Sequence, residues 1–356
     1  MEPKQKLIAD LTAYRDEVFA GESPFYAELM DRIAADVSAG GPCWKLLEPF
    51  AGEPRTEFFP LRALAGVHGM VLDGSAPELV AYYPSVGGSG DAAAAWPAIL
   101  AALASHSPEV VADLRHPLQT NETSRCGALA AGFHVIAAGC PLPVRALELG
   151  SSAGLNLHFD RYRYEGGGRA AGPEDSPVRF VDYWRGGVPP FDSKLDVAER
   201  RGCDLDPIDA GTEAGRAELL SYVMPDDLGR IELMRGALEV AAEFPVRVDQ
   251  ASADDWIAAQ LAEPAVGVAT VVFHSIFWMY PPAEVTDRIA ATIEAAGERA
   301  SAETPLFWLR YEESAERIGT VELRLRSWPG GEEQLLATGG HHWAPLQWLA
   351  PAAGPA

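Results

Sequence analysis

The chain has 356 residues, 48% of them apolar, so it can bury the core of one large domain or of two smaller ones. Its formal net charge is -23 and its sequence pI is near 4.7. Because an acidic surface repels phosphate backbones, we expect no nucleic acid among its partners.

The cysteines and the apolar runs further limit the classes of protein to which the chain can belong. The four cysteines form no Cys-x-x-Cys pair and show no zinc spacing, so we expect no metal site. Isolated thiols and an N-terminus without a secretion signal favour the cytoplasm. The longest apolar runs, such as VGVATVVFHSIFWMY at 266–280, are too short to span a bilayer, so we also expect no membrane partner.

Residues 1–140 are predicted to form a helical N-terminal domain, a cap or lid. Leu7, Leu11, Tyr14 and Val18 recur at intervals of three and four residues, which predicts an amphipathic helix. Ser23 and Pro24 then have the residue types of an N-cap and a first helical turn. Further helices, broken by prolines, are expected at 59–74, 91–106, 107–118 and 121–139, and no strand is expected before residue 141.

From residue 141 to 356, strands and helices alternate. Strands are expected at 144–150, 197–207, 245–252, 268–277 and 305–312, with an extra strand at 178–184. Helices are expected between them, the first of them at 154–164. This alternation predicts an α/β fold with a Rossmann-like, mostly parallel sheet that is covered on both faces. An antiparallel C-terminal hairpin is expected at 321–340, around Pro-Gly-Gly.

The stretch RALELGSSAGLNLHFDRYRY at 145–164 has two interpretations. Residues 150–154 match the G-x-S-x-G nucleophile elbow of a serine hydrolase, in which Ser152 would attack an ester and His274, His341 or His342 would serve as base. The same residues match the E-x-G-x-x-x-G turn of a cofactor-binding fold. A hydrolase sheet places several strands before its nucleophile, whereas this strand is the first one expected, so the order favours the cofactor turn.

Glu148 favours the cofactor turn as well. A carboxylate at the end of a buried strand is costly unless it meets a cationic or hydrogen-bonding partner, and S-adenosylmethionine would bring an ammonium and a sulfonium group. Gly150 and Gly154 let the backbone approach a ligand closely. The dinucleotide and P-loop fingerprints fail, which suits a cofactor without phosphate. The expected cofactor-binding turn comprises Glu148, Gly150, Ser151, Ser152, Ala153, Gly154 and Asn156.

Later strand ends supply further candidates for the cofactor. An acidic residue after the second strand of such a fold accepts the ribose hydroxyls, and Asp204 or its rival Asp182 has this position. Ala253 and Asp254 lie near the expected adenine position, although capping of the following helix explains the aspartate equally well. His274, at the end of the fourth strand, would face the same crevice.

Several motifs carry a family resemblance. QTNETSR, LELGSSAGLNLHFDRYRY, RRGCDLDPID, SYVMPDD, FHSIFWMYPP and LRLRSWPGG stand in this order and resemble the bacterial family of domain of unknown function 2332. Its core is similar to class I S-adenosylmethionine-dependent methyltransferases, a likeness at the level of fold. Methyltransferases of that class usually have a second glycine where this chain has Ser152.

The resemblance also implies a substrate-binding loop. Gln119, Asn121, Glu122 and Arg125 would read a small-molecule acceptor, and Arg125 would bind a carboxylate in bidentate fashion. The alternative is that Asn121 or its neighbour Thr120 only caps the next helix.

The expected reaction is methyl transfer from S-adenosylmethionine to a small molecule. His274 is the candidate base, because an ordinary histidine titrates near neutrality, and Tyr280 would orient the acceptor. A histidine bonded within the sheet and an aromatic packing cluster are the structural alternatives. Two other functions stay open: a serine hydrolase, and a cofactor-fold protein that binds without catalysis.

Overall fold

The computed structural model describes residues 2–54, 59–106, 114, 119–317, 319–341 and 345–350. The chain divides into two compact units. The first comprises residues 1–120 and 212–235, and the second comprises residues 121–211 and 236–356. The helix expected at 107–118 falls almost wholly outside the described residues.

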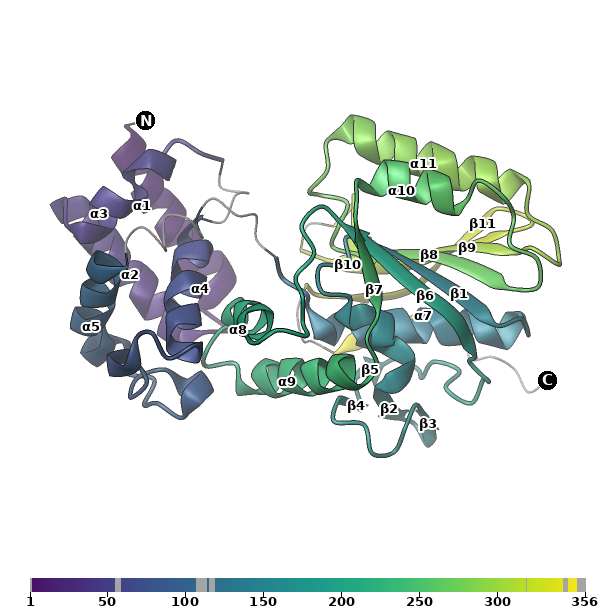
Figure 1. Ribbon diagram of the computed structural model, residues 1–356, viewed down its shortest axis with the longest axis horizontal. Helices are drawn as coiled ribbons and strands as arrows, with labels where there is room; N and C mark the ends of the chain where they lie inside the picture. The colour runs from purple at the N-terminus through teal and green to yellow at the C-terminus, as the bar shows by residue number, and fades with distance from the viewer. Residues whose placement is uncertain are drawn as a thin grey trace. The chain divides into compact units, whose positions relative to one another are not determined.

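The first unit is helical, as predicted for the N-terminal part of the chain (Figure 1). Ser23 caps α2 by accepting a hydrogen bond from the Tyr26 amide, and Pro24 stands in the first turn. Pro97 lies inside α5 and does not break it, contrary to expectation. The described helices that lie wholly in this unit are α1 (Pro3–Tyr14), η1 (Arg15–Phe19), α2 (Pro24–Ala39), α3 (Pro42–Leu47), η2 (Glu48–Phe50), α4 (Phe59–Leu72), η4 (Pro77–Leu79), η5 (Pro84–Val86), α5 (Ala92–Ser105) and α8 (Glu213–Ser221).

The second unit is built on a mixed sheet with the order β5-β12-β11-β10-β9-β8-β1-β6-β7. The neighbouring strands β9, β8, β1, β6 and β7 run parallel. The pairs β9–β10, β10–β11 and β11–β12 are antiparallel, and β5 pairs in parallel with β12 at the edge. The strands are β1 (Val144–Leu149), β5 (Trp184–Arg185), β6 (Val197–Asp204), β7 (Arg247–Gln250), β8 (Ala269–Ser275), β9 (Leu306–Glu313), β10 (Val321–Trp328), β11 (Glu332–Gly339) and β12 (Leu346–Trp348). The predicted mostly parallel sheet and the C-terminal hairpin are confirmed.

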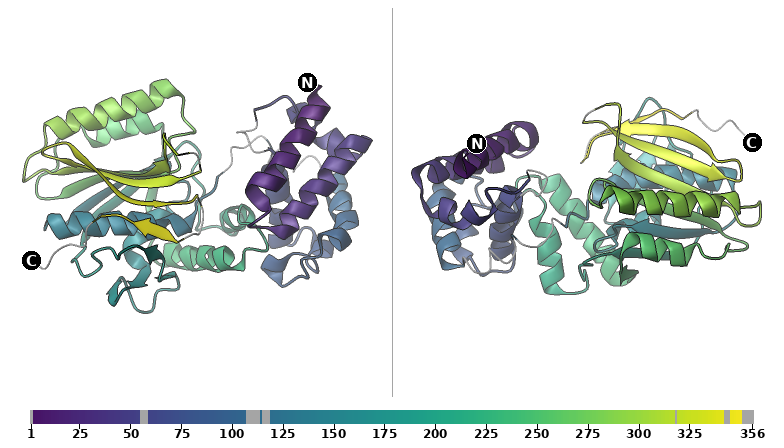
Figure 2. Two further views of the ribbon diagram at one scale, coloured as in Figure 1. Left: turned by 180° about the vertical axis from the view of Figure 1, so that it is seen from behind. Right: turned by 90° about the horizontal axis from the view of Figure 1, so that it is seen from above.

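Helices cover both faces of this sheet (Figures 1 and 2). On one face, α10 (Ala253–Gln260) and α11 (Ala283–Glu298) contribute Ile257, Ile289 and Ile293 to a core that includes Leu147 and Val272. On the other face lie α7 (Cys126–Gly139) and η7 (Leu155–Arg161). Their stacked rings of Phe133 and Phe159, with centroids 3.8 Å apart, meet Phe273 of β8. Every residue of β8 is buried, as expected for a strand covered on both sides.

The division of the chain differs from the predicted boundary at residue 140. Helix α7 and the 3-10 turn η6 (Thr123–Arg125) belong to the sheet unit, because the α7 residues are buried on the sheet and Gly132 lies against Leu309 of β9. Residues 212–235 belong to the helical unit, where Met224 joins the core and His68 Nδ1 bonds the Ser221 carbonyl. Helix α9 (Leu228–Glu243) begins in one unit and ends in the other.

Two local expectations between 154 and 184 were wrong. The helix expected at 154–164 is the short 3-10 helix η7, and the chain then enters a second sheet of order β3-β2-β4. Its strands are β2 (Arg163–Gly166), β3 (Arg169–Ala171) and β4 (Arg179–Val181). The single strand expected at 178–184 is split between the two sheets at Asp182, whose φ of 49° ends β4.

No helix in the described part of the chain is long and apolar enough to cross a membrane.

Candidate functional site

The direction in which the chain adds successive parallel strands to the sheet reverses at β1. The chain builds outward from β1 to β6 and β7 on one side, and returns to β8 and β9 on the other. The carboxyl ends of β1, β6 and β8 therefore open on one edge of the sheet, where open α/β sheets bind their ligands. Most of the predicted site residues follow these three strands.

The turn after β1 depends on left-handed backbone conformations. Gly150 and Gly154 have φ values of 67° and 76°, and Ser152 between them has a φ of 51°. A Cβ on Gly150 would lie 2.4 Å from the ring of Phe277, and one on Gly154 would lie 2.9 Å from a methyl group of Val248. Both glycines are therefore required by backbone conformation and by close packing.

The β1 turn is fastened to the end of β6. The Ser151 amide donates to the Cys203 carbonyl over 3.0 Å, and the Ser152 amide donates to Oδ2 of Asp204 over 2.8 Å. The Ser151 hydroxyl donates to the Glu148 carbonyl over 3.2 Å, and Ala153 is buried beside it. Asp204 thus lies directly beside the turn. Its rival Asp182 follows β4, where its amide donates to the Glu165 carbonyl of β2.

Glu148 is the last residue but one of β1 and is only 2% exposed. Its Oε2 has no hydrogen-bond partner. Burial raises the pKa of this carboxyl well above its usual range, and the nearby charge of Asp204 adds to the effect. Ser151, Asn156 and Arg125 oppose it. A buried acceptor without a partner is costly, so this atom is suited to a ligand that brings a positive charge or a donor.

The segment 121–126 packs against the same turn. Oδ1 of Asn121 accepts the Leu155 amide over 2.9 Å, and Oδ1 of Asn156 accepts the Cys126 thiol over 3.1 Å. Glu122 accepts the Ser124 amide as the cap of η6, so capping falls to Glu122 and not to Asn121.

Arg125 reaches the end of β8. Its Nη1 donates to the Ser275 carbonyl over 3.1 Å, and its Nε lies 3.5 Å from the His341 carbonyl. Gln119, the remaining predicted substrate residue, belongs to the helical unit.

His274 is fully buried, and both of its ring nitrogens are bonded. Nδ1 lies 2.6 Å from Oε1 of Glu312, and the Trp308 indole donates to Nε2 over 3.0 Å. An indole nitrogen can only donate, so Nε2 carries a lone pair and Nδ1 carries the proton. Both ring nitrogens of His274 therefore have partners within the protein, and its role as a base stays a prediction.

Exposed apolar side chains also gather at the strand ends. Leu205 follows Asp204 and is 73% exposed, while Met279 and Tyr280, after β8, are 45% and 50% exposed. Tyr280 is thus accessible to solvent over half of its surface. Solvent-facing apolar groups near a polar crevice are common in ligand sites.

Backbone strain marks the same edge. The described non-glycine residues with positive φ are Ser152, Asp182 and Ile276, and two of them follow the adjacent strands β1 and β8. Ile276, with a φ of 46°, is β-branched, so this conformation costs about 1–3 kcal/mol. Such strain clusters at functional sites, although it does not by itself identify a ligand.

Ala253 and Asp254 have a different environment. Asp254 stands in the first turn of α10 and accepts hydrogen bonds from Ser252 and, at 2.8 and 2.6 Å, from the guanidinium of Arg288 on α11. These bonds lower the pKa of Asp254. The carboxylate joins two helices, so its partners in the protein already explain its presence.

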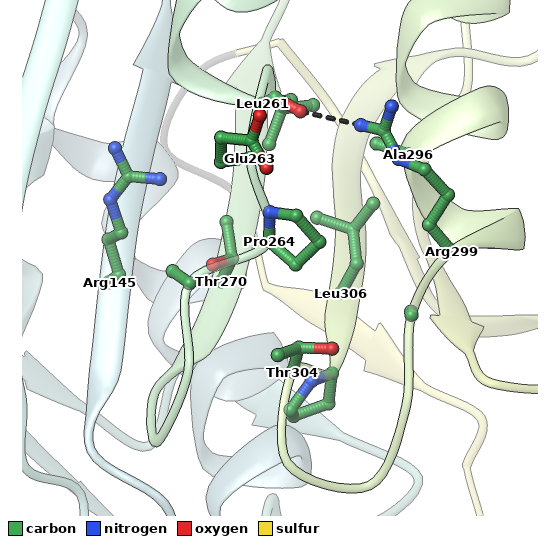
Figure 3. A pocket seen from close by; sticks show the side chains of 12 residues that line it. Arg145, Leu261, Glu263, Pro264, Thr270, Ala296, Arg299, Thr304 and Leu306 are labelled. Atoms are coloured by element: carbon green, nitrogen blue, oxygen red, sulfur yellow. Dashed lines mark hydrogen bonds between the residues drawn. The ribbon is translucent and has the colours of Figure 1, made fainter.

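A shallow pocket lies at the opposite edge of the sheet, where β1, β8 and β9 begin (Figure 3). Arg145 in its wall is paired with Glu199 and bonded to Gln260, and Arg299 donates to the Leu261 carbonyl. Its two arginines are thus occupied in structural contacts, and the pocket lies away from the strand ends just described. Across the described residues, no three His, Cys, Asp or Glu side chains form a group that could hold a metal ion.

The serine-hydrolase interpretation receives mixed support from the geometry. Ser152 has the strained backbone of a nucleophile elbow, and its buried Oγ has no hydrogen-bond partner. No strand precedes Val144 in the described chain, and His341 Nε2 is bonded to Glu313. His342 lies outside the described residues.

Glu312 and Phe277 were missed in the sequence. Glu312 stands at the end of β9 and accepts bonds from His274, Phe277 and Trp278, while the Phe277 ring packs on Gly150. The sequence signal for Glu312 was a carboxylate near the end of a strand that neighbours β8. The same signal pointed to Glu148.

The chain belongs to the family of uncharacterized proteins conserved in bacteria, DUF2332, whose model matches residues 12–348. The comparison with curated proteins and the comparison with solved structures found no match.

Proposed function

We propose that this member of the DUF2332 family binds S-adenosylmethionine at the carboxyl ends of β1, β6 and β8 and transfers its methyl group to a small molecule. The observation that carries the proposal is Glu148, a buried carboxylate with an unpartnered Oε2 at the centre of the sheet's switch point.

The chemistry of the turn supports this choice of cofactor. A buried carboxylate becomes favourable when a cation meets it, and S-adenosylmethionine carries both a sulfonium and an ammonium group. The turn lacks the glycine spacing and the lysine of phosphate-binding loops. The strand order around β1 is that of the Rossmann-like class, to which class I methyltransferases belong, and this remains an analogy of fold.

The residues at the strand ends would each contact a different part of the cofactor. Glu148 would face the cationic part of the cofactor, and the left-handed backbone at Gly150 and Gly154 would form the turn over which the cofactor lies. Asp204 would accept ribose hydroxyls, because its carboxylate stands at the end of β6 directly beside the β1 turn and accepts the Ser152 amide.

When bound, the cofactor supplies an electrophilic methyl group, and the protein supplies alignment. Holding an acceptor in line with that group is worth up to roughly 7–11 kcal/mol, without a general base. Asn121, Glu122 and Arg125 lie beside the β1 turn and the end of β8, so they are the residues proposed to orient the acceptor. An acceptor that already offers a lone pair suits a site in which His274 is occupied.

Binding and transfer are tested separately. The thermal midpoint should rise on addition of S-adenosylmethionine or S-adenosylhomocysteine, since ligand at 100 times its Kd adds about 2.7 kcal/mol to the unfolding free energy. Transfer is tested with a radiolabelled methyl group and pools of small-molecule acceptors. No midpoint shift at millimolar ligand would contradict the proposal. Binding without transfer to any acceptor would support a non-catalytic binding protein.

A serine hydrolase is the second candidate, favoured by the φ of 51° and the unpartnered Oγ at Ser152. Labelling with a fluorophosphonate probe distinguishes it, with Ser152→Ala as the control. Labelling that Ser152→Ala abolishes would favour the hydrolase. An unlabelled protein whose Ser152→Ala variant still binds S-adenosylhomocysteine would favour the methyltransferase.

A further inference from the structure

Glu312 collects three donors from the segment that follows β8. Its Oε1 accepts the Nδ1 proton of His274 at 2.6 Å and the Phe277 amide at 2.9 Å. Its Oε2 accepts the Trp278 amide at 3.3 Å. One side chain on β9 therefore binds the last part of β8 and two successive amides beyond it.

His274 extends this network to the aromatic core. Trp308 donates to its Nε2, which leaves the proton on Nδ1 and directs it to Glu312. The Trp278 ring stacks on the imidazole with centroids 4.9 Å apart and planes inclined by 15°. The imidazole is thus held by a donor, an acceptor and a ring, which fixes the geometry on which Glu312 depends.

The segment held by Glu312 includes the strained residue. Ile276 has a φ of 46°, which a β-branched side chain rarely adopts, and its amide donates to the Tyr311 carbonyl. Phe277 follows it, with its ring in the space that a Cβ on Gly150 would fill. The hydrogen bonds that Glu312 accepts from the Phe277 and Trp278 amides offset the unfavourable conformation of Ile276. They also fix the Phe277 ring beside the β1 turn.

We propose that Glu312 is a positioning residue: its carboxylate holds the Ile276–Trp278 turn so that the Phe277 ring packs on Gly150 of the β1 turn. Holding the turn requires only the contacts above. The effect on a ligand rests on the proposed function, in which the S-adenosyl group binds at the β1 turn beside Phe277.

The test compares Glu312→Ala, Glu312→Gln and Glu313→Gln in the full-length protein. Glu313 is the matched control, because it is the next residue on β9 and its half-exposed carboxylate bonds His341. Hydrogen exchange in the ligand-free protein reports on residues 276–280. Exchange there should rise about tenfold or more in Glu312→Ala, less in Glu312→Gln, which keeps an acceptor oxygen, and not in Glu313→Gln.

The second readout is the Kd for S-adenosylhomocysteine by calorimetric titration. It should rise about tenfold in Glu312→Ala and less in Glu312→Gln, and Glu313→Gln should match the wild type. A merely structural residue would lower the thermal midpoint without this graded loss of affinity. If Glu312→Ala does not fold, the Glu312→Gln comparison still decides both readouts.

Unchanged exchange at 276–280 in both Glu312 variants would overturn the proposal. Faster exchange together with an unchanged Kd would overturn it as well, because the turn would then have no effect on ligand binding. A wild-type protein that does not bind S-adenosylhomocysteine would instead contradict the proposed function, and hydrogen exchange would still decide whether Glu312 holds the turn.

Discussion

Replacing Glu148 by Gln should stabilise the ligand-free protein while weakening its proposed function. The wild-type carboxyl is 2% exposed, its Oε2 has no partner, and burial raises its pKa. A buried group without its partner costs about 1–3 kcal/mol. Gln has the same shape and no charge but needs partners for its NH₂ group, so we expect a gain of about 1 kcal/mol at pH 8, or roughly 2–4 °C in Tm.

The gain should depend on pH in a defined direction. Because the folded state holds the Glu148 proton more tightly than the unfolded chain, wild-type stability falls as pH rises above the ordinary carboxyl pKa of 4.5 toward the raised folded value. The advantage of Glu148→Gln should therefore vanish near pH 4.5 and grow toward pH 8. Scanning calorimetry at several pH values measures it.

Glu322→Gln is the matched control with the opposite sign. Glu322 is also buried, which alone would raise its pKa, but hydrogen bonds from Arg317, Ser314 and Arg324 lower the pKa to about 2. Its contribution to stability is present above the ordinary carboxyl pKa and is lost as pH falls toward 2. Glu322→Gln should therefore destabilise the protein at neutral pH.

The same Glu148→Gln substitution should weaken S-adenosylmethionine binding by about 2–3 kcal/mol, or roughly 30- to 150-fold in Kd, because a buried charge pair is lost. S-adenosylhomocysteine lacks the sulfonium charge, so its loss should be smaller. Calorimetric titration of both ligands measures the difference. A Glu148→Gln protein that is less stable than the wild type at pH 8, and that binds each ligand as tightly as the wild type does, would contradict this prediction.

Three further substitutions test the site. Asp204→Asn should weaken S-adenosylhomocysteine binding by about 1.5–3 kcal/mol, measured by titration, because the ribose hydroxyls would lose a charged acceptor; unchanged affinity would contradict its role. Gly150→Ala should destabilise the protein by about 2–4 kcal/mol in denaturant unfolding, because the new Cβ would lie 2.4 Å from Phe277 at a φ of 67°, and Gly150→Ala with Phe277→Leu should recover part of the loss. Asp254→Asn should lower stability by no more than about 1 kcal/mol, because Arg288 is 58% exposed, and should leave ligand affinity unchanged; a large loss of affinity would restore Asp254 to the cofactor site.

Sequence patterns were informative about the strand ends at the centre of the sheet. Buried strands, glycines and a carboxylate occur close together in the chain at β1, so the left-handed Gly150 and Gly154 and the position of Glu148 followed from local chemistry. The hairpin of β10 and β11 was predictable because its signal, alternating residues around Pro-Gly-Gly, is also local in the chain.

Features that depend on contacts between distant residues were not predictable. Glu312 bonds His274 across 38 positions, and neither residue's neighbours in the chain indicate the other. Residues 212–235 look like an ordinary connection between strands, yet Met224 packs into the helical core. Residues 155–161 form a 3-10 helix where an α-helix was expected, and the small sheet that follows pairs β2 with two later segments of the chain.

A crystal structure of the protein grown with S-adenosylhomocysteine tests the central claim most directly. We expect the nucleoside to lie over the Gly150–Gly154 turn, with its ribose at Asp204 and its amino acid part facing Glu148. A saturated crystal in which the ligand lies elsewhere, or in which these strand ends hold none, would contradict it.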